Sequence, residues 1–236
     1  MKKKRLKNIL INLGLFLLLL LGLALVFNRQ IKQFLMSKTS ARYQIEQVTR
    51  EQIEANKQVE ATFDFAAVES ASLEAVLQAQ LSGKVLPVIG GIAVPSVEIQ
   101  LPIFKGLGNE ALLFGAGTFS PEQQMGQGNY ALASHRIEQS TILFTRLEEV
   151  KMGDVIYLTD LDQIYVYETI ESKRIEAYQV EVIEEVPDQT LVTLITCGEA
   201  AGITRWMVQG KLTETIPVDK ATPAMLEAFS MTQQTF

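Results

Sequence analysis

Residues 191–210 read LVTLITCGEAAGITRWMVQG, and this stretch decides the fold. Its first part, residues 191–197, consists of aliphatic and β-branched residues, which is typical of a buried strand that ends at Cys197. A short loop over residues 198–202 follows, and a second strand pattern begins close to Arg205. Two such strands predict a hairpin. The hairpin would bring the thiol of Cys197 and the guanidinium of Arg205 side by side at one rim of a sheet.

The chain contains one histidine and one cysteine, so any chemistry that joins the two must use His135 and Cys197. His135 ends the run over residues 129–135, in which larger side chains alternate with small alanines. This alternation predicts a strand with one tightly packed face. His135 is therefore expected at a strand end as well.

Together these residues resemble the class A sortases, the membrane-anchored cysteine transpeptidases of Gram-positive bacteria. The resemblance rests on residues 193–197, which read TLITC and match the family's TLxTC signature, on the Ala-Ser-His of residues 133–135, and on Arg205. Arg205 lies eight positions after Cys197, a short spacing that resembles the streptococcal type of the family. The resemblance covers about residues 87–217 and the membrane anchor.

The second half of the chain is built from short apolar runs separated by turn residues, with one short helix predicted over residues 142–150. Many short strands with few helices indicate an all-β barrel or sandwich. The resemblance implies an all-β fold with short helices, an eight-stranded sortase-type β-barrel, preceded by a transmembrane helix and a helical stalk.

At 236 residues the chain has room for one domain with a sizeable core and a short helical extension. We expect four segments along it. They are a cytoplasmic basic N-terminus (1–8), a transmembrane signal-anchor helix (9–27), a helical stalk or linker (28–81) and an extracytoplasmic sortase-like catalytic domain (82–236).

Residues 9–27 are rich in leucine and carry no charge. As a helix they would extend roughly 28 Å, which is enough to cross the hydrocarbon core of a bilayer. The alternative is a cleaved signal peptide, whose apolar region is usually about 7–15 residues long and ends at a small-x-small cleavage site. Residues 26–28 (Val-Phe-Asn) do not supply that site, so a retained anchor is the favoured interpretation.

The charge distribution predicts the orientation of the anchor and excludes one class of partner. Five basic residues precede the span, whereas Arg29 and Lys32 are the only charges in the ten residues that follow it. The positive-inside rule then keeps the N-terminus in the cytoplasm and places the rest outside the cell membrane. Beyond the span there are 16 basic and 27 acidic residues. This acidic balance disfavours binding to nucleic acid or to anionic lipids, which would need basic patches.

Residues 39–81 lack proline, are rich in Glu, Gln and Ala, and carry apolar residues near helical spacing, with an interruption at residues 62–65. The pattern predicts two helices. The favoured interpretation is a stalk that lifts the domain off the membrane. In the alternative, apolar side chains of this segment pack on the domain and modulate access to its groove; the candidates are Phe63, Phe65, Leu73, Val76 and Leu77.

Three side chains are candidates for catalysis. Cys197 would be the nucleophile, because a neighbouring cation favours the reactive thiolate over the thiol. His135 would transfer protons as general acid and base, since the ordinary pKa of histidine is close to the working pH. Arg205 would stabilise the oxyanion. The less specific alternatives are a small buried core residue for Cys197 and a surface ion pair with Glu199 or Glu214 for Arg205.

The resemblance also implies the substrates. They are secreted proteins with a C-terminal LPxTG-type sorting signal, cleaved between Thr and Gly through a thioester on Cys197, and an amine of the peptidoglycan precursor lipid II as acceptor. The result would be surface proteins anchored to the cell wall. The candidates for lining the peptide groove are Ala133, Ser134, Ile195 and Thr196, and more weakly Ile92, Ala93 and Val94.

Two other functions stay open at this point: a thiol hydrolase of peptides or cell-wall amides, and a non-catalytic membrane-anchored binding module. No cofactor is expected. The acidic residues between positions 176 and 188 could bind Ca²⁺, and the resemblance implies that some sortases order a comparable loop in this way. A solvated acidic face is the favoured interpretation, because the spacing matches no tight coordination loop. One cysteine and one histidine cannot supply the usual zinc ligand set.

Overall fold

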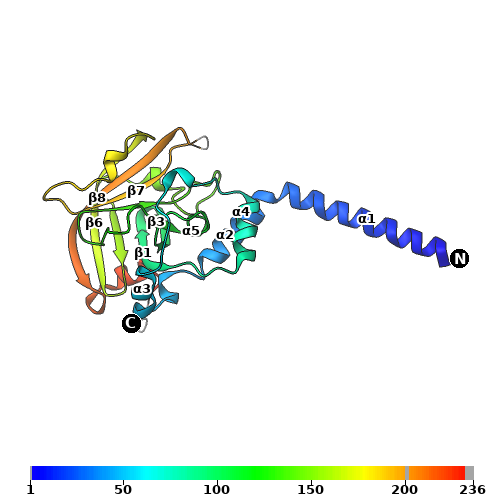
Figure 1. Cartoon of the computed structure of the whole chain (residues 1–236), viewed down its shortest axis with the longest axis horizontal. Coiled ribbons are helices and arrows are strands. Elements are labelled where there is room, and N and C mark those ends of the chain that lie inside the picture. The colour runs from blue at the N-terminus through cyan, green and yellow to red at the C-terminus, as the bar shows by residue number, and fades with distance from the viewer. Residues whose placement is uncertain (1, 200–201, 232–236) are drawn as a thin grey trace.

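A computed structural model describes residues 2–199 and 202–231 of the chain (Figure 1). Part of the predicted loop over residues 198–202 therefore lies outside the described residues. Eight strands close into a barrel in the order β1-β2-β3-β4-β7-β8-β6-β5, which confirms the predicted fold class. The strands are β1 (Val88–Val94), β2 (Ile99–Phe104), β3 (Ala116–Thr118), β4 (Asn129–Ala133), β5 (Val155–Thr159), β6 (Gln163–Glu176), β7 (Leu191–Cys197) and β8 (Thr204–Pro217).

Strand β7 is the centre of the fold, because it pairs in parallel with β4 and antiparallel with β8. One of its faces points into the barrel, where Val192 and Leu194 are fully buried. Its other face is covered as well, and there Thr193 donates a hydrogen bond of 2.7 Å from Oγ1 to Oδ1 of Asn129. Burial on both faces explains the continuous aliphatic and β-branched composition of this strand.

Helices precede, separate and follow the strands along the chain. They are α1 (Lys2–Val26), α2 (Asn28–Ser40), α3 (Arg50–Lys57), α4 (Leu73–Ser82), α5 (Asn109–Leu112) and α6 (Pro223–Ala228). Helix α1 projects away from the barrel (Figure 1). Its segment Arg5–Val26 has a mean hydropathy of 2.9 and none of it is buried, so α1 is long and apolar enough to cross a membrane.

Residues 28–81 do not form a stalk that stands apart from the barrel. Met36, Ile53 and Val76, from α2, α3 and α4, are 1%, 0% and 0% exposed. Met36 and Val76 belong to the same buried cluster as the strands, and α3 packs directly on β1. The amphipathic stripe of this segment thus faces the domain. The two helices predicted between residues 39 and 81 are present as α3 and α4.

The prediction of a short helix over residues 142–150 is wrong. Only a 3₁₀ turn, Leu147–Glu149, forms there, and Leu143 has a positive φ of 57°, which ends any helix. Thr145 explains the difference, because its hydroxyl accepts a hydrogen bond from the backbone N–H of Ile137 and donates to the carbonyl of Ile142. Such local side-chain bonds compete with helix formation.

Packing of residues 28–81 on the barrel can be tested by comparing two truncations. We expect Ile53→Ala to lower the free energy of unfolding by about 2–4 kcal/mol, because Ile53 is completely buried. Leu81→Ala, at a side chain that is 87% exposed, should change it by less than about 0.5 kcal/mol. Urea unfolding of the full chain in detergent micelles measures both. A free stalk would make the two substitutions equally harmless.

Candidate active site

The parallel pairing of β4 and β7 brings His135 and Cys197 to the same rim of the barrel. Ala133 lies opposite Ile195, and the pairing continues past the end of β4, where the N–H of Ser134 donates to the carbonyl of Ile195 at 3.2 Å. The same register, continued two residues past the Ala133–Ile195 pair, brings His135 level with Cys197. The carboxyl ends of parallel strands meet at one edge of a sheet, so the register places these two residues at the same edge.

Arg205 completes the group through the antiparallel pairing of β7 and β8. It lies directly opposite Cys197 in the register, as the sequence predicts. Both side chains also face Gly202, since a Cβ atom added there would lie 3.9 Å from Nη1 of Arg205 and 4.0 Å from Sγ of Cys197. The structure therefore brings all three predicted residues to one rim, which we call the catalytic rim.

A second arginine, Arg136, joins the two loops that carry the histidine and the cysteine. Its guanidinium forms a bidentate ion pair with Glu148, with N–O distances of 2.9 and 2.6 Å. Nη1 also donates to the carbonyl of Gly198 at 3.2 Å, and Gly198 directly follows Cys197. Arg136 thus positions the backbone on both sides of the rim. The sequence analysis missed it, because only its place beside His135 could have indicated a role.

His135 is held neutral in the resting protein. Its Nε2 atom is buried and has no hydrogen-bond partner among the described residues. Burial, and then the positive charge of Lys32, lower the pKa of His135 from its ordinary value to about 4. The sequence analysis assumed that His135 has the ordinary pKa of histidine, near the working pH. Burial and Lys32 lower this pKa, so that assumption does not hold in the folded protein.

Arg205 is fixed by backbone carbonyls and keeps donors free. Its Nη1 donates to the carbonyls of Gly202 at 2.6 Å and Thr204 at 2.9 Å, whereas its buried Nε has no partner among the described residues. The alternative of an ion pair with Glu199 does not hold. Glu199 instead accepts hydrogen bonds from Thr204 and pairs with Arg174 at 3.0 Å, and the side-chain hydrogen bond from Thr204 is the main reason that the pKa of Glu199 is lowered.

Buried polar atoms in proteins are nearly always paired, and exceptions concentrate where a ligand supplies the missing partner. Five such side-chain atoms occur among the described residues. Two of them, Nε2 of His135 and Nε of Arg205, belong to the residues on either side of Cys197. Within the described part of the chain, the catalytic rim therefore has one buried polar atom without a hydrogen-bond partner on each side of the Cys197 thiol.

An apolar cavity of about 240 Å³ opens beside the catalytic rim. Ile195 of β7 and Arg205 of β8 form its base. Its other walls come from three separate segments, and the side chains are Phe63, Phe65, Phe119, Ile175, Val180, Val182 and Ile183, together with Glu176, Ala177 and Gln179. The cavity thus combines apolar walls with one cationic end, which suits an extended peptide with bulky apolar side chains.

Residues 61–69, which we call the strap, run across this cavity. The ring of Phe65 lies 5.4 Å from that of Phe119 and 5.5 Å from the guanidinium carbon of Arg205. Hydrogen bonds fix the strap on both sides of Phe65: the carbonyl of Thr62 accepts from Leu107 at 2.7 Å, and Asn109 bonds to the backbone at positions 67 and 69. This geometry favours the interpretation that the segment modulates access to the groove.

The predicted groove residues fall into three groups. Ile195 lines the cavity. Ala133, Ser134 and Thr196 are buried between β4 and β7, where Oγ1 of Thr196 donates to the carbonyl of Ser134 at 2.8 Å, so they support the rim from below. The three weaker candidates on β1 are wrong. Ile92, Ala93 and Val94 are at most 1% exposed and belong to core clusters. Their strand, β1, is also separated from β7 by three strands in the barrel order.

The acidic stretch between positions 176 and 188 supplies a wall of the cavity. The helical turn Val180–Ile183 points Val182 and Ile183 inward, and Nδ2 of Asn129 donates to the carbonyls of Val182 and Glu184 at 3.0 Å each. The apolar residues interleaved with the acidic ones were the signal that the sequence analysis passed over. Among the described residues no group of three metal-ligating side chains occurs, and the calcium effect on this stretch stays a prediction.

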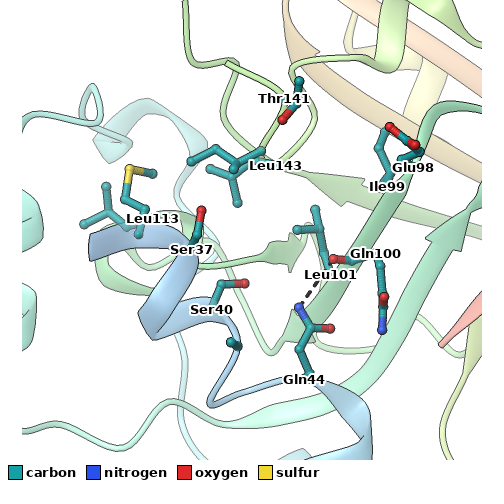
Figure 2. Close-up of a pocket in the computed structure, with 13 residues that line it drawn as sticks. Ser37, Ser40, Gln44, Glu98, Ile99, Gln100, Leu101, Leu113, Thr141 and Leu143 are labelled. Atoms are coloured by element: carbon teal, nitrogen blue, oxygen red, sulfur yellow. Dashed lines mark hydrogen bonds between the residues drawn. The ribbon is translucent and has the colours of Figure 1, made fainter. Parts of the chain in front are cut away.

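Another cavity, of about 260 Å³, lies between α2 and β2 (Figure 2). Gln44 reaches across it and donates from Nε2 to the carbonyl of Gln100 at 3.4 Å, while its Oε1 is buried without a partner among the described residues. None of the three residues of the catalytic rim lines this cavity. It therefore has no part in the candidate active site.

Comparisons with known proteins point to a single family. The Sortase domain family matches residues 92–213. Sortase A of Streptococcus agalactiae is 44% identical over 91% of this chain and 89% of its own length, and Sortase A of Listeria monocytogenes is 38% identical over 86% and 92%. The structure of the Listeria protein matches with a TM-score of 0.56 at 39% identity, over 60% of this chain and 96% of that chain. Sortase C-3 of Streptococcus pneumoniae shares the fold with a TM-score of 0.60 at 23% identity, over 82% and 98%.

The state of His135 can be measured directly, because it is the only histidine in the chain. We expect its imidazole resonances to titrate with a midpoint near pH 4. Lys32→Gln should raise this midpoint by removing the second cause of the shift. Since the folded pKa lies below the unfolded value, protonation favours unfolding, and stability should fall as the pH drops from 6.5 toward 4. A midpoint above 6 would contradict the burial of this side chain.

The contact of Phe65 with Arg205 predicts that the strap limits access to Cys197. An aromatic pair and a cation–π contact together contribute about 1–2.5 kcal/mol, so Phe65→Ala should speed alkylation of Cys197 by a peptide-linked reagent roughly 5- to 60-fold. Phe34→Ala, at a phenylalanine of α2 that is 64% exposed, is the matched control. Equal rates in both variants would show that the strap is already open.

Proposed function

The chain is a member of the sortase family, and from this premise we propose that it is a cysteine transpeptidase that cleaves LPxTG-type sorting signals between Thr and Gly. It transfers the released threonyl carboxyl group to an amine of a peptidoglycan precursor, lipid II, and so anchors secreted proteins to the cell wall. The observation that carries this proposal is the convergence of the only histidine and the only cysteine of the chain at one rim, with Arg205 opposite the thiol.

The first half-reaction begins with attack by the sulfur of Cys197 on the threonyl carbonyl carbon. A carbon–sulfur bond forms and negative charge develops on the carbonyl oxygen, and Arg205, whose Nε has no partner among the described residues, donates hydrogen bonds to this oxygen. The carbon–nitrogen bond to glycine then breaks, and the glycine nitrogen takes a proton from His135. The products are a thioester on Cys197 and a free glycine-terminated peptide.

The second half-reaction reverses these roles. An acceptor amine attacks the thioester carbonyl, His135 accepts the proton that the amine loses, and the carbon–sulfur bond breaks. Cys197 leaves as the thiolate, and a new amide bond joins the protein to its acceptor. In the resting protein His135 is neutral, so it can serve as the base at once, whereas its role as acid requires a prior proton transfer from the thiol.

The cavity and the strap support the assignment of the peptide groove. The apolar walls suit the leucine and proline of a sorting signal, and the cationic end at Arg205 suits peptide carbonyls. Because Phe65 occupies part of this cavity, an incoming peptide replaces the phenyl ring there. Phe119, Val182 and Ile183 then become contacts of the substrate.

Helix α1 supports a place in the cell membrane, with the N-terminus in the cytoplasm and the catalytic rim outside. The apolar segment Arg5–Val26 is long enough for a single span, and the excess of basic residues before it favours this orientation. Both substrates named above occur on the outer side of the membrane.

Mass spectrometry of the full chain with an LPxTG peptide tests the reaction class. A thioester adduct on Cys197 that lacks the C-terminal glycine fragment is expected, and an added amine should convert it to a ligation product. A hydrolase would release only the free acid even with amine in excess, and a binding module would form no adduct.

Substitutions at the rim test the three roles. Cys197→Ala should abolish turnover, and His135→Ala should lower kcat/KM by several orders of magnitude, on the order of 10³-fold or more. Arg205→Ala should lower it by about 10²–10³-fold, because an oxyanion donor is lost. Near-wild-type activity of Arg205→Ala would refute its role in the oxyanion site.

A further inference from the structure

A large cavity lies where the membrane helix meets the barrel, on the His135 side of the catalytic rim. We call it the juxtamembrane pocket, and its volume is about 670 Å³. Three segments line it: residues 25–32 at the junction of α1 and α2, residues 70–71 just after the strap, and residues 136–138 just after His135. The membrane anchor and the segments that directly follow the strap and His135 thus meet at one place.

The juxtamembrane pocket is cationic in an otherwise acidic extramembrane domain. Arg29, Lys32 and Arg136 line it, against one acidic residue, Glu138. Arg136 is already paired with Glu148. Lys32 donates from Nζ only to a backbone carbonyl, and Arg29 donates to the side chain of Gln139; within the described part of the chain neither forms a salt bridge. Arg29 and Lys32 therefore bring two positive charges to this pocket against the single carboxylate of Glu138.

The position of these charges matches the phosphate layer of a membrane. The apolar segment of α1 ends at Val26, so Arg29 and Lys32 stand three and six residues beyond it along nearly continuous helix. At 1.5 Å per residue they lie about 4.5 and 9 Å above the hydrocarbon core. The headgroup region of each leaflet is on the order of 5–8 Å thick, so Arg29 lies within it and Lys32 just above it. Leu25 and Val26, which also line the pocket, remain at the level of the acyl chains.

The pocket is also coupled to the catalytic rim. Its wall formed by residues 136–138 begins one position after His135. Arg136 reaches the carbonyl of Gly198, next to Cys197. Lys32 is close enough for its charge to lower the pKa of His135. A ligand in this pocket therefore lies beside the reacting groups.

We propose that the juxtamembrane pocket binds the phosphate or pyrophosphate group of a membrane lipid, and that the acceptor amine enters the catalytic rim on the headgroup of this lipid. Arg29 supplies a planar guanidinium and Lys32 an ammonium, the two groups best suited to phosphate oxygens. Leu25 and Val26 contact the first methylenes of the chain. The use of the amine rests on the proposed function, whereas the binding of the lipid does not.

Bound phosphate would also change the state of His135. An anion beside Lys32 offsets the charge that opposes protonation, so the pKa of His135 should rise toward its ordinary value. The other charged side chains of this region are Glu138, which lines the pocket, Arg136, which is paired with Glu148, and Arg205 at the opposite side of Cys197. The acceptor lipid would thereby help to provide the protonated imidazole that the cycle needs.

The binding is tested with the full chain in phosphatidylcholine nanodiscs that contain a polyprenyl pyrophosphate. The readout is the imidazole resonance of the only histidine at a fixed pH between 4 and 6.5. We expect a shift toward the protonated form at low mole fraction of the pyrophosphate lipid. Arg29→Gln should weaken this binding about 5-fold, since a basic residue at the membrane surface contributes about 1 kcal/mol, and it leaves in place the Lys32 charge that acts on His135.

The matched control is Arg42→Gln, which removes one arginine from the turn after α2 but no charge from the pocket. It should leave the shift unchanged. An equal loss in this control means general attraction to an anionic surface and refutes the site. An equal response to free inorganic pyrophosphate in plain phosphatidylcholine discs refutes the lipid as its source.

Transfer assays separate this inference from the proposed function. With a lipid-linked amine, Arg29→Gln should lose about 5-fold in the rate of transfer, while formation of the Cys197 thioester and transfer to soluble triglycine stay unchanged, because Lys32 and its charge beside His135 are left in place. Equal loss with both acceptors would assign Arg29 to stability or to the chemistry instead. Absence of any thioester in the unmodified chain would refute the proposed function and leave the lipid-binding result standing.

Discussion

The parallel pairing of β4 with β7 is the constraint on which the rest of the site depends. Two strands that are separated by about sixty residues run in the same direction, so their carboxyl ends meet, and each delivers one reactive side chain there. Thr196 and Ser134 strengthen this end of the pair with a hydrogen bond between side chain and backbone. A slip of one residue would turn either His135 or Cys197 to the wrong face.

The sequence predicted this arrangement well for a physical reason. A strand buried on both faces must be apolar along its whole length, and β7 therefore stood out, as did the scarcity of histidine and cysteine. The hairpin register placed Arg205 correctly because it follows from a short connection. What the sequence could not show was packing between distant segments. Residues 28–81 looked like a stalk because amphipathic helices carry the same pattern whether they cover a neighbouring domain or each other.

The same limit explains the errors at the groove. Ile92 and Val94 had the composition of a groove lining, but composition does not tell which side of a closed barrel a strand occupies. Val182 and Ile183 were hidden among acidic residues, and only the hydrogen bonds from Asn129 fix them as a wall. The pKa of His135 was beyond the sequence for a related reason, since it depends on burial and on Lys32, more than a hundred positions away.

The direct packing of α2 on the barrel has a consequence for encounter with substrates. An enzyme on a long tether searches a hemisphere, whereas here Met36 and the neighbouring contacts of α2 lock the barrel to its anchor. With the membrane orientation and substrates proposed above, the reactive groups would stay at a constant height above the bilayer, and partners would reach them chiefly by lateral diffusion in the plane of the membrane. Under the same proposal, exported chains still threaded through the membrane would be captured there, while those already released would pass above.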